Sequence, residues 1–100
     1  MKLVWTEPAV DSLQTIHDYI AGDNAFYALR FIDRLTFSVE RIPEFPEKGR
    51  KVPESDDENI REMIFQGYRI IYRLHPEKVE ILAVVHGSRD LSRSRPWELG

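Results

Sequence analysis

The stretch IREMIFQGYRIIYRLHPEKVEILAVVHGSRDL, residues 60–91, decides the fold of this chain. It contains three consecutive runs of β-favouring residues, separated by Gln66-Gly67 and by His75-Pro76-Glu77-Lys78. Short connections with Gly or Pro between such runs are typical of antiparallel hairpins. The second half of the chain therefore predicts a three-stranded antiparallel sheet.

A turn at Pro76 that pairs Leu74 with Val79 sets the register of the last two runs. It opposes Arg73 to Glu80, Ile71 to Leu82 and Arg69 to Val84. Because alternate side chains point to opposite faces, the sheet acquires two different sides, which a one-residue slip would exchange. The predicted open side is mixed and carries Arg69, Ile71, Arg73, Glu80, Leu82, Val84 and His86. The predicted helix-facing side is apolar and carries Tyr68, Ile70, Tyr72, Leu74, Val79, Ile81, Ala83 and Val85.

The first half of the chain predicts a short strand over residues 2–5 and then two amphipathic helices. Thr6-Glu7-Pro8 supplies the hydroxyl cap, the acid and the proline of a helix start, and Gly22 ends that helix. Asp23 or Asn24 caps the second helix, which Pro43 stops. Apolar residues at helical spacing form the inward stripes: Ala9, Leu13, Ile16 and Ile20, then Ala28, Ile32, Leu35, Val39 and Ile42, widened by Leu29, Phe31 and Phe37. The short connection makes the two helices an antiparallel hairpin.

One hundred residues with 42% hydrophobic content predict a single α+β domain, residues 1–100, with a small core. Residues 43–59 form its one long loop, and residues 92–100 form a loosely held tail that Trp97 anchors. The chain lacks cysteine and its three histidines show no ligand spacing, so we expect neither a metal nor a cofactor. No apolar run reaches membrane-spanning length and no signal peptide is present, which predicts a cytoplasmic protein with no membrane partner.

The formal net charge of −3 is unevenly distributed. Residues 1–46 carry four Lys and Arg against seven Asp and Glu, whereas residues 60–97 carry seven against four. Because nonspecific nucleic-acid affinity comes from phosphate neutralisation, an acidic chain is a poor nonspecific binder. A local basic face in the second half could still hold a short anionic segment.

Arginines inside the β-runs are the first candidates for a site. Arg73, opposite Glu80, is interpreted as half of a cross-strand ion pair. Arg69 either clamps a phosphate or carboxylate with its planar fork of donors, or pairs with Glu62 on the preceding strand. The residues alone leave both readings of Arg69 open.

The remaining candidates lie at strand ends and in the loop. His86 is placed to titrate or donate, or else is a hydrogen-bonded structural imidazole. Arg89 and Asp90 are expected to bridge locally. A tight hairpin after the first run points Arg61 toward the helices, and a bulge would reverse this. Glu54 opens an acidic run in the loop, where taken alone it is a solvated acid.

This arrangement of elements resembles the RelE/ParE superfamily of bacterial toxins from type II toxin–antitoxin modules, over nearly the whole chain. The segments that carry the resemblance are Leu3-Val4-Trp5-Thr6, Asp11-Ser12-Leu13, Asp18-Tyr19-Ile20-Ala21, Phe45-Pro46, Gly49-Arg50, Val52-Pro53-Glu54, Ile60-Arg61-Glu62, Tyr68-Arg69-Ile70-Ile71-Tyr72-Arg73 and His86-Gly87-Ser88-Arg89-Asp90-Leu91. The resemblance implies a toxin that a cognate antitoxin covers with an extended or helical segment.

Two mechanisms occur among the proteins it resembles. RelE-like members are metal-independent endoribonucleases that cut mRNA on the ribosome, using a base, a cation for the phosphorane and an acid. ParE-like members share the fold but poison DNA gyrase instead. Similarity to the ribonucleases implies Glu54 as base, Arg69 as phosphate clamp and His86 as acid or cation, although their C-terminal catalytic tyrosine is absent.

The HGSRDL segment and the acidic character resemble ParE-like members more closely. The preferred reading is therefore a growth inhibitor that acts on DNA gyrase through protein contact, and the alternative is a nuclease whose partners are the ribosome and mRNA. Four arginines are the expected partner-binding residues: Arg50, Arg61, Arg73 and Arg89.

Overall fold

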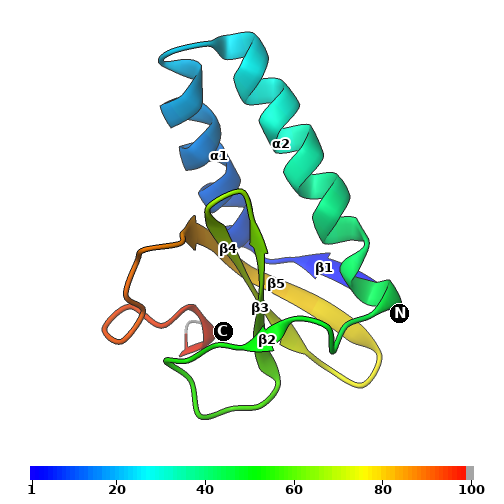
Figure 1. Ribbon diagram of the computed structural model, residues 1–100. Helices are drawn as coiled ribbons and strands as arrows, with labels where there is room; N and C mark the ends of the chain where they lie inside the picture. Colours follow the sequence, from blue (N-terminus) through cyan, green and yellow to red (C-terminus); the bar gives the residue numbers. More distant parts are fainter. Residues whose placement is uncertain (99–100) are drawn as a thin grey trace.

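A helical hairpin packs on one face of a five-stranded sheet in the computed structural model, which describes residues 1–98 (Figure 1). The α+β class is confirmed. The elements are β1 (Lys2–Trp5), α1 (Glu7–Ala21), α2 (Ala25–Glu40), β2 (Arg50–Lys51), β3 (Ile60–Phe65), β4 (Tyr68–Leu74) and β5 (Lys78–His86), with 3₁₀ turns at Ile42–Glu44 and Pro96–Glu98. The strand order is β1-β5-β4-β3-β2. The first strand joins the sheet parallel to β5, and the two-residue β2, inside the predicted loop, was not predicted.

The predicted caps hold both helices. Thr6 Oγ1 accepts a hydrogen bond from Ala9 N at 3.3 Å, and Asn24, rather than Asp23, caps α2 by accepting from Tyr27 N at 2.9 Å. The inward stripes pack on the sheet as expected, with one exception. Leu29 and Phe37 are 58% and 62% exposed, so the prediction that they widen the buried face of α2 is wrong. At about 100° per residue, Leu29 projects about 120° and Phe37 about 160° away from Leu35, so neither points into the core.

The predicted register of the hairpin formed by β4 and β5 is confirmed near its turn and is wrong beyond a β-bulge. Leu74 pairs with Val79, and Arg73 pairs with Glu80, as predicted. Tyr72 then opposes Ile81 while Ile71 opposes Ala83, which leaves Leu82 as the extra residue of a β-bulge. The predicted pairs of Ile71 with Leu82 and of Arg69 with Val84 therefore do not form.

The bulge exchanges the faces of the second half of β5. Val84 packs in the cluster beneath the helices, whereas Ala83 and Val85 pack in the cluster on the opposite side. His86 pairs with Tyr68 and shares its side, with ring centroids 5.8 Å apart. The prediction that His86 lies on the same face as Arg69 is therefore wrong.

The side predicted to be open is a second small core. Two segments fold over this face: the loop before β3 and the chain after β5 (Figure 1). The core consists of Val52, Ile60, Ile71, Leu82, Ala83, Val85 and Leu91, with Trp97 packed against it. Trp97 anchors the tail as predicted, and its carbonyl accepts from Arg73 Nη2 at 2.5 Å. Residues 99–100 of the predicted tail lie outside the described residues.

Within residues 1–98, neither helix has the length and apolar character that crossing a membrane requires.

Candidate functional site

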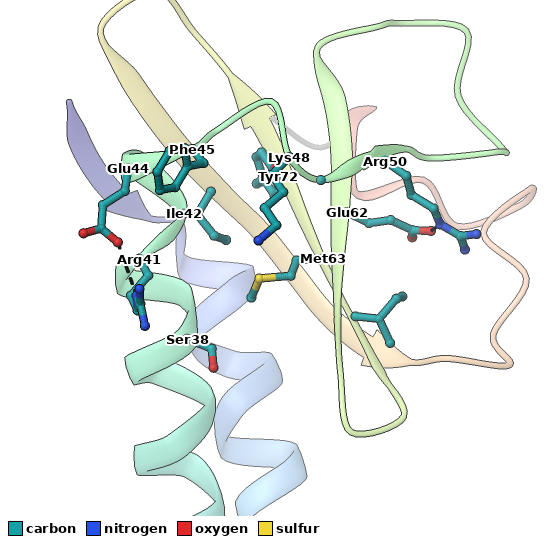
Figure 2. A pocket seen from close by; sticks show the side chains of 12 residues that line it. Ser38, Arg41, Ile42, Glu44, Phe45, Lys48, Arg50, Glu62, Met63 and Tyr72 are labelled. Atoms are coloured by element: carbon teal, nitrogen blue, oxygen red, sulfur yellow. Dashed lines mark hydrogen bonds and ion pairs between the residues drawn. The ribbon is translucent and has the colours of Figure 1, made fainter.

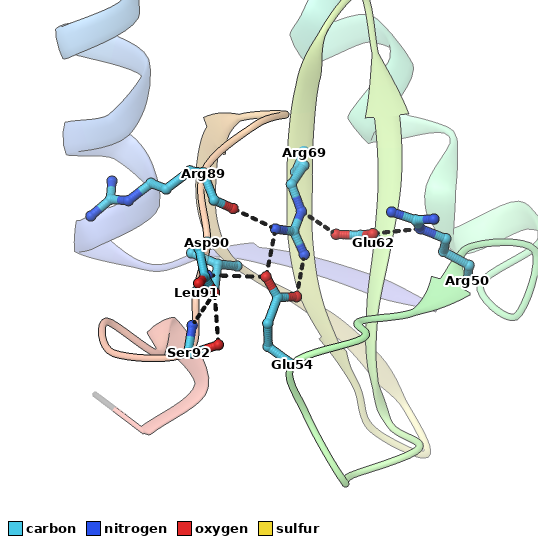
Figure 3. Close-up of polar contacts among 8 residues, drawn as sticks. All are labelled: Arg50, Glu54, Glu62, Arg69, Arg89, Asp90, Leu91 and Ser92. Carbon is cyan, nitrogen blue, oxygen red and sulfur yellow. Dashed lines mark hydrogen bonds and ion pairs between the residues drawn. The ribbon is translucent and has the colours of Figure 1, made fainter.

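The buried guanidinium of Arg69 is the centre of the charged network in this fold (Figure 3). Its side chain is 5% exposed, at the middle of the face covered by the loop and the C-terminal segment. Nε donates to Glu62 at 2.6 Å, and Nη2 donates to Glu54 at 2.7 Å. Nη1 donates to the second oxygen of Glu54 at 3.0 Å and to the carbonyl of Arg89 at 2.8 Å. Arg69 therefore forms a bidentate salt bridge with Glu54.

Three separate parts of the chain bring the partners of Arg69 to it. Glu62 comes from the neighbouring β3 and is fully buried, and its other oxygen accepts from Arg50 Nε at 2.5 Å. Glu54 comes from the loop and also accepts from the backbone N–H of Leu91 at 3.0 Å. The network consequently fastens both covering segments to the sheet.

Electrostatics keep Glu54 and Arg69 ionised at neutral pH. The hydrogen bonds from Arg69, reinforced by the backbone N–H of Leu91, outweigh burial and lower the pKa of Glu54 to about 2. The hydrogen bond that Arg69 donates to Glu54 is also the main reason that the pKa of Arg69 lies above its ordinary value. A carboxylate with so low a pKa is a weak proton acceptor near pH 7.

The structure brings together two of the three residues expected for a ribonuclease site. Glu54 and Arg69 are in direct contact, as stated above. His86 lies on the helix side of β5, is exposed, and has its Nδ1 2.7 Å from Ser88 Oγ. A proton donor at His86 is therefore separated by the sheet from the guanidinium of Arg69.

The four arginines expected to bind partners occupy different surroundings. Arg50 flanks Glu62 and stays 63% exposed. Arg61 points to the helix side, as the tight hairpin predicted, and its Nη1 donates to the carbonyl of Gly49 at 2.9 Å. Arg73 forms the predicted pair with Glu80 at 3.7 Å. These three therefore lie on both sides of the sheet.

The predicted bridge between Arg89 and Asp90 is wrong. Asp90 instead accepts hydrogen bonds from both the backbone N–H and the hydroxyl of Ser92, at 2.9 and 2.7 Å. A short carboxylate side chain reaches the backbone two residues ahead more easily than a neighbouring guanidinium. The exposed side chain of Arg89 forms no ion pair with any residue in the range 1–98.

A groove of about 610 Å³ opens between the end of α2, the segment before β2 and the outer edge of β3 (Figure 2). Its floor includes Ile42, Met63 and Tyr72, and the exposed side chains of Phe45 and Ile64 border it. Charged side chains of both signs also line it: Arg41, Glu44, Lys48, Arg50 and Glu62. The groove was not predicted, because it depends on how β2 and the preceding turn fold back on β3.

The edge of β3 beside this groove is only partly covered. The two residues of β2 pair with Arg61 and Glu62, whereas Met63, Ile64 and Phe65 pair with β4 alone. Unpaired backbone groups at a sheet edge accept a strand from another segment. The groove and this edge together therefore form a surface suited to an extended peptide.

Comparison with known proteins adds the family. Residues 3–91 match the family model described as the ParE toxin of the type II toxin–antitoxin system parDE. The chain is 30% identical to Toxin RelE2 of Caulobacter vibrioides over 89 residues, covering 88% of this chain and 97% of that protein. It is 32% identical to the putative toxin Y4kP of Sinorhizobium fredii over 87 residues, covering 85% and 86% of the two chains.

Two solved structures share the fold. One is a chain of the chromosomal ParDE toxin–antitoxin system from P. aeruginosa, with a TM-score of 0.73, 21% identity, and coverage of 86% of this chain and 95% of that one. The other is from the toxin–antitoxin complex RelBE2 of Mycobacterium tuberculosis, with a TM-score of 0.56, 20% identity, and coverage of 85% and 95%.

Proposed function

The chain belongs to the ParE toxin family of type II toxin–antitoxin systems, within the RelE/ParE superfamily, and we propose that it inhibits growth by protein contact with DNA gyrase rather than by cutting RNA. The observation that carries this proposal is the burial of Arg69 between two carboxylates. Its guanidinium already makes four hydrogen bonds within the chain.

A metal-independent ribonuclease needs a cation that is free to meet the charge developing on the phosphate. Arg69 would have to leave Glu54 and Glu62 before it could bind a phosphate, and Glu62 would then be a buried carboxylate with only Arg50 beside it. Such an exchange is costly, which weighs against a phosphate clamp at this position.

The other two residues of the nuclease alternative give little support to it. Glu54 has a pKa of about 2 and is engaged by Arg69, so it is a poor general base. His86 is on the far side of the sheet from both, as described above. The overall charge of −3 also disfavours binding to ribosomal RNA.

We further propose that the groove and the open edge of β3 receive the cognate antitoxin. The structural relatives named above come from a toxin–antitoxin system and a toxin–antitoxin complex. An extended segment with alternating apolar and acidic side chains fits the apolar floor and Lys48, whereas Arg41 and Arg50 already pair with Glu44 and Glu62 at the same groove. Ile64→Glu should therefore weaken antitoxin binding, because it removes apolar contact and repels acidic side chains, whereas Val10→Glu, at an exposed apolar residue of α1 away from the groove, should not.

One paired experiment tests the choice of target. The purified chain is incubated with gyrase and supercoiled plasmid, and separately with ribosomes that carry a defined mRNA. We expect trapped double-strand breaks in the plasmid and intact mRNA. Cleaved mRNA together with unbroken plasmid would overturn the proposal and favour the alternative of a ribosome-dependent endonuclease that uses Glu54, Arg69 and His86.

A further inference from the structure

The second helix has two opposite apolar faces. Its inward face holds the four buried residues Ala28, Phe31, Leu35 and Val39. Its outward face presents Phe26, Leu29 and Phe37, whose exposed fractions are 69%, 58% and 62%. A surface helix normally turns charged and polar residues outward, so this second apolar face needs a separate explanation.

The outward residues form one continuous strip along α2. At about 100° per residue, Phe26, Leu29, Arg30, Asp33 and Phe37 fall within a sector about 100° wide, centred opposite the buried face. We call these five residues the outer stripe. All five side chains are exposed.

The order of charges makes the outer stripe complementary to a second copy of itself. Phe26 and Arg30 are four residues apart, and so are Asp33 and Phe37. In two antiparallel copies of α2 related by a two-fold axis, Phe26 of one copy therefore faces Phe37 of the other, and Arg30 faces Asp33. Each contact occurs twice, because the axis repeats it.

The surface beside Phe37 has room for the incoming ring. A shallow hollow of about 330 Å³ lies there, lined by Asp33, Arg34, Phe37, Ser38, Phe65 and Gln66. In the antiparallel arrangement, Phe26 of the second copy faces Phe37, which lines this hollow. The guanidinium of Arg30 lies 6.0 Å from the centroid of its own Phe26 ring, so the charged and aromatic parts of the stripe already adjoin.

We propose that this chain forms a two-fold symmetric dimer through the outer stripe of α2. Three large apolar side chains per copy give a contact smaller than a standard stable interface, so the dimer is weak and depends on concentration. The proposal is independent of which target the toxin acts on, since it uses neither the Arg69 network nor the groove beside β3.

A charge swap tests the pairing directly by sedimentation velocity of the full chain, from micromolar to millimolar concentration. Arg30→Asp and Asp33→Arg, taken singly, each place two like-charged pairs in the dimer and should weaken association about ten-fold or more. The double variant R30D/D33R restores opposite charges and should restore association. Asp11→Arg, on an exposed turn of α1 outside the stripe, is the matched control and should leave association unchanged.

Two results with the native chain and the charge variants would overturn the proposal. The first is a native chain that remains a monomer throughout the concentration range. The second is a dimer that the single reversals do not weaken or the double variant does not restore, which would place the interface elsewhere. Thermal melting by circular dichroism verifies that each variant is folded. Should a charge variant fail to fold, Phe37→Ser provides an uncharged test, and retention of the dimer in it would equally contradict the model.

Discussion

Replacing Arg69 with alanine should destabilise this fold more than the loss of any exposed ion pair. Removing the guanidinium leaves Glu62, fully buried, with Arg50 as its remaining cation, and leaves the two oxygens of Glu54 without their main donor. Breaking a buried charged pair by deleting one partner costs about 3–5 kcal/mol, because a charge remains in a poorly solvated site. Total stability of a small domain is about 5–15 kcal/mol, so this loss is a large share of it.

Urea denaturation followed by circular dichroism at pH 7 measures the loss as a shift of the unfolding midpoint at constant slope. Arg41→Ala is the control, because Arg41 pairs with Glu44 at 3.2 Å with both side chains mostly exposed. That pair should contribute less than about 1 kcal/mol. The double variant R69A/E62Q should be more stable than R69A, since a neutral amide is less costly to bury than a stranded carboxylate.

A loss below about 1 kcal/mol in R69A would refute the reasoning, since it would mean that Glu62 is solvated or finds another partner. Equal stability of R69A and R69A/E62Q would contradict it in the same way. The expected loss also limits the use of R69A as a test of nuclease chemistry, because a drop in RNA cleavage would then report on folding as well as on catalysis.

Three further predictions concern the same face and its surroundings. Because the pKa of Glu54 is about 2 in the fold against an ordinary value of 4.5, its contribution to folding stability is fully present above pH about 4.5 and is lost as the pH falls toward 2. E54Q should therefore flatten that part of a profile of unfolding free energy against pH, and an unchanged slope would show that Glu54 is not its source. Tyr72 is 1% exposed and its hydroxyl donates a hydrogen bond to the carbonyl of Pro46 at 2.6 Å. In urea titrations, Tyr72→Ala should lower the free energy of unfolding by about 3–5 kcal/mol and Tyr72→Phe by about 1–2 kcal/mol, and a much smaller loss for alanine would place this ring outside the core. A Cβ at Gly49 would overlap the hydroxyl of Tyr72 and lie 2.9 Å from the carbonyl of Glu62, so Gly49→Ala should lower stability by about 1–3 kcal/mol, and a neutral effect would show that the turn can yield there.

Local sequence signals predicted most of the secondary structure. The caps at Thr6 and Asn24, the helical spacing of the inward stripes and the Gln66-Gly67 turn are decided by residues close together in the chain. The left-handed φ of 42° at Gln66 and 87° at Gly67 fits this two-residue hairpin. In α2, the apolar pattern misleads only at Leu29 and Phe37, which are apolar but exposed and do not pack in the core.

The faces of β5 could not be read from its sequence. Ile81 to Val85 are five consecutive apolar residues, all buried, because the sheet is covered on both sides. A strand buried on both faces lacks the alternation that would reveal a bulge at Leu82. The same continuous run explains why His86 was assigned to the wrong side.

The sequence by itself determined the class of fold, the family resemblance and the contact between Arg73 and Glu80, since each depends on short-range pattern or on one turn. Only the tertiary structure decided between the two readings of Arg69 and placed it in a buried network. Its partners come from β3, from a loop residue 15 positions earlier and from the backbone of Arg89, 20 positions later. A charge becomes a buried structural centre only when distant segments exclude water from it, and that exclusion is a property of the folded chain.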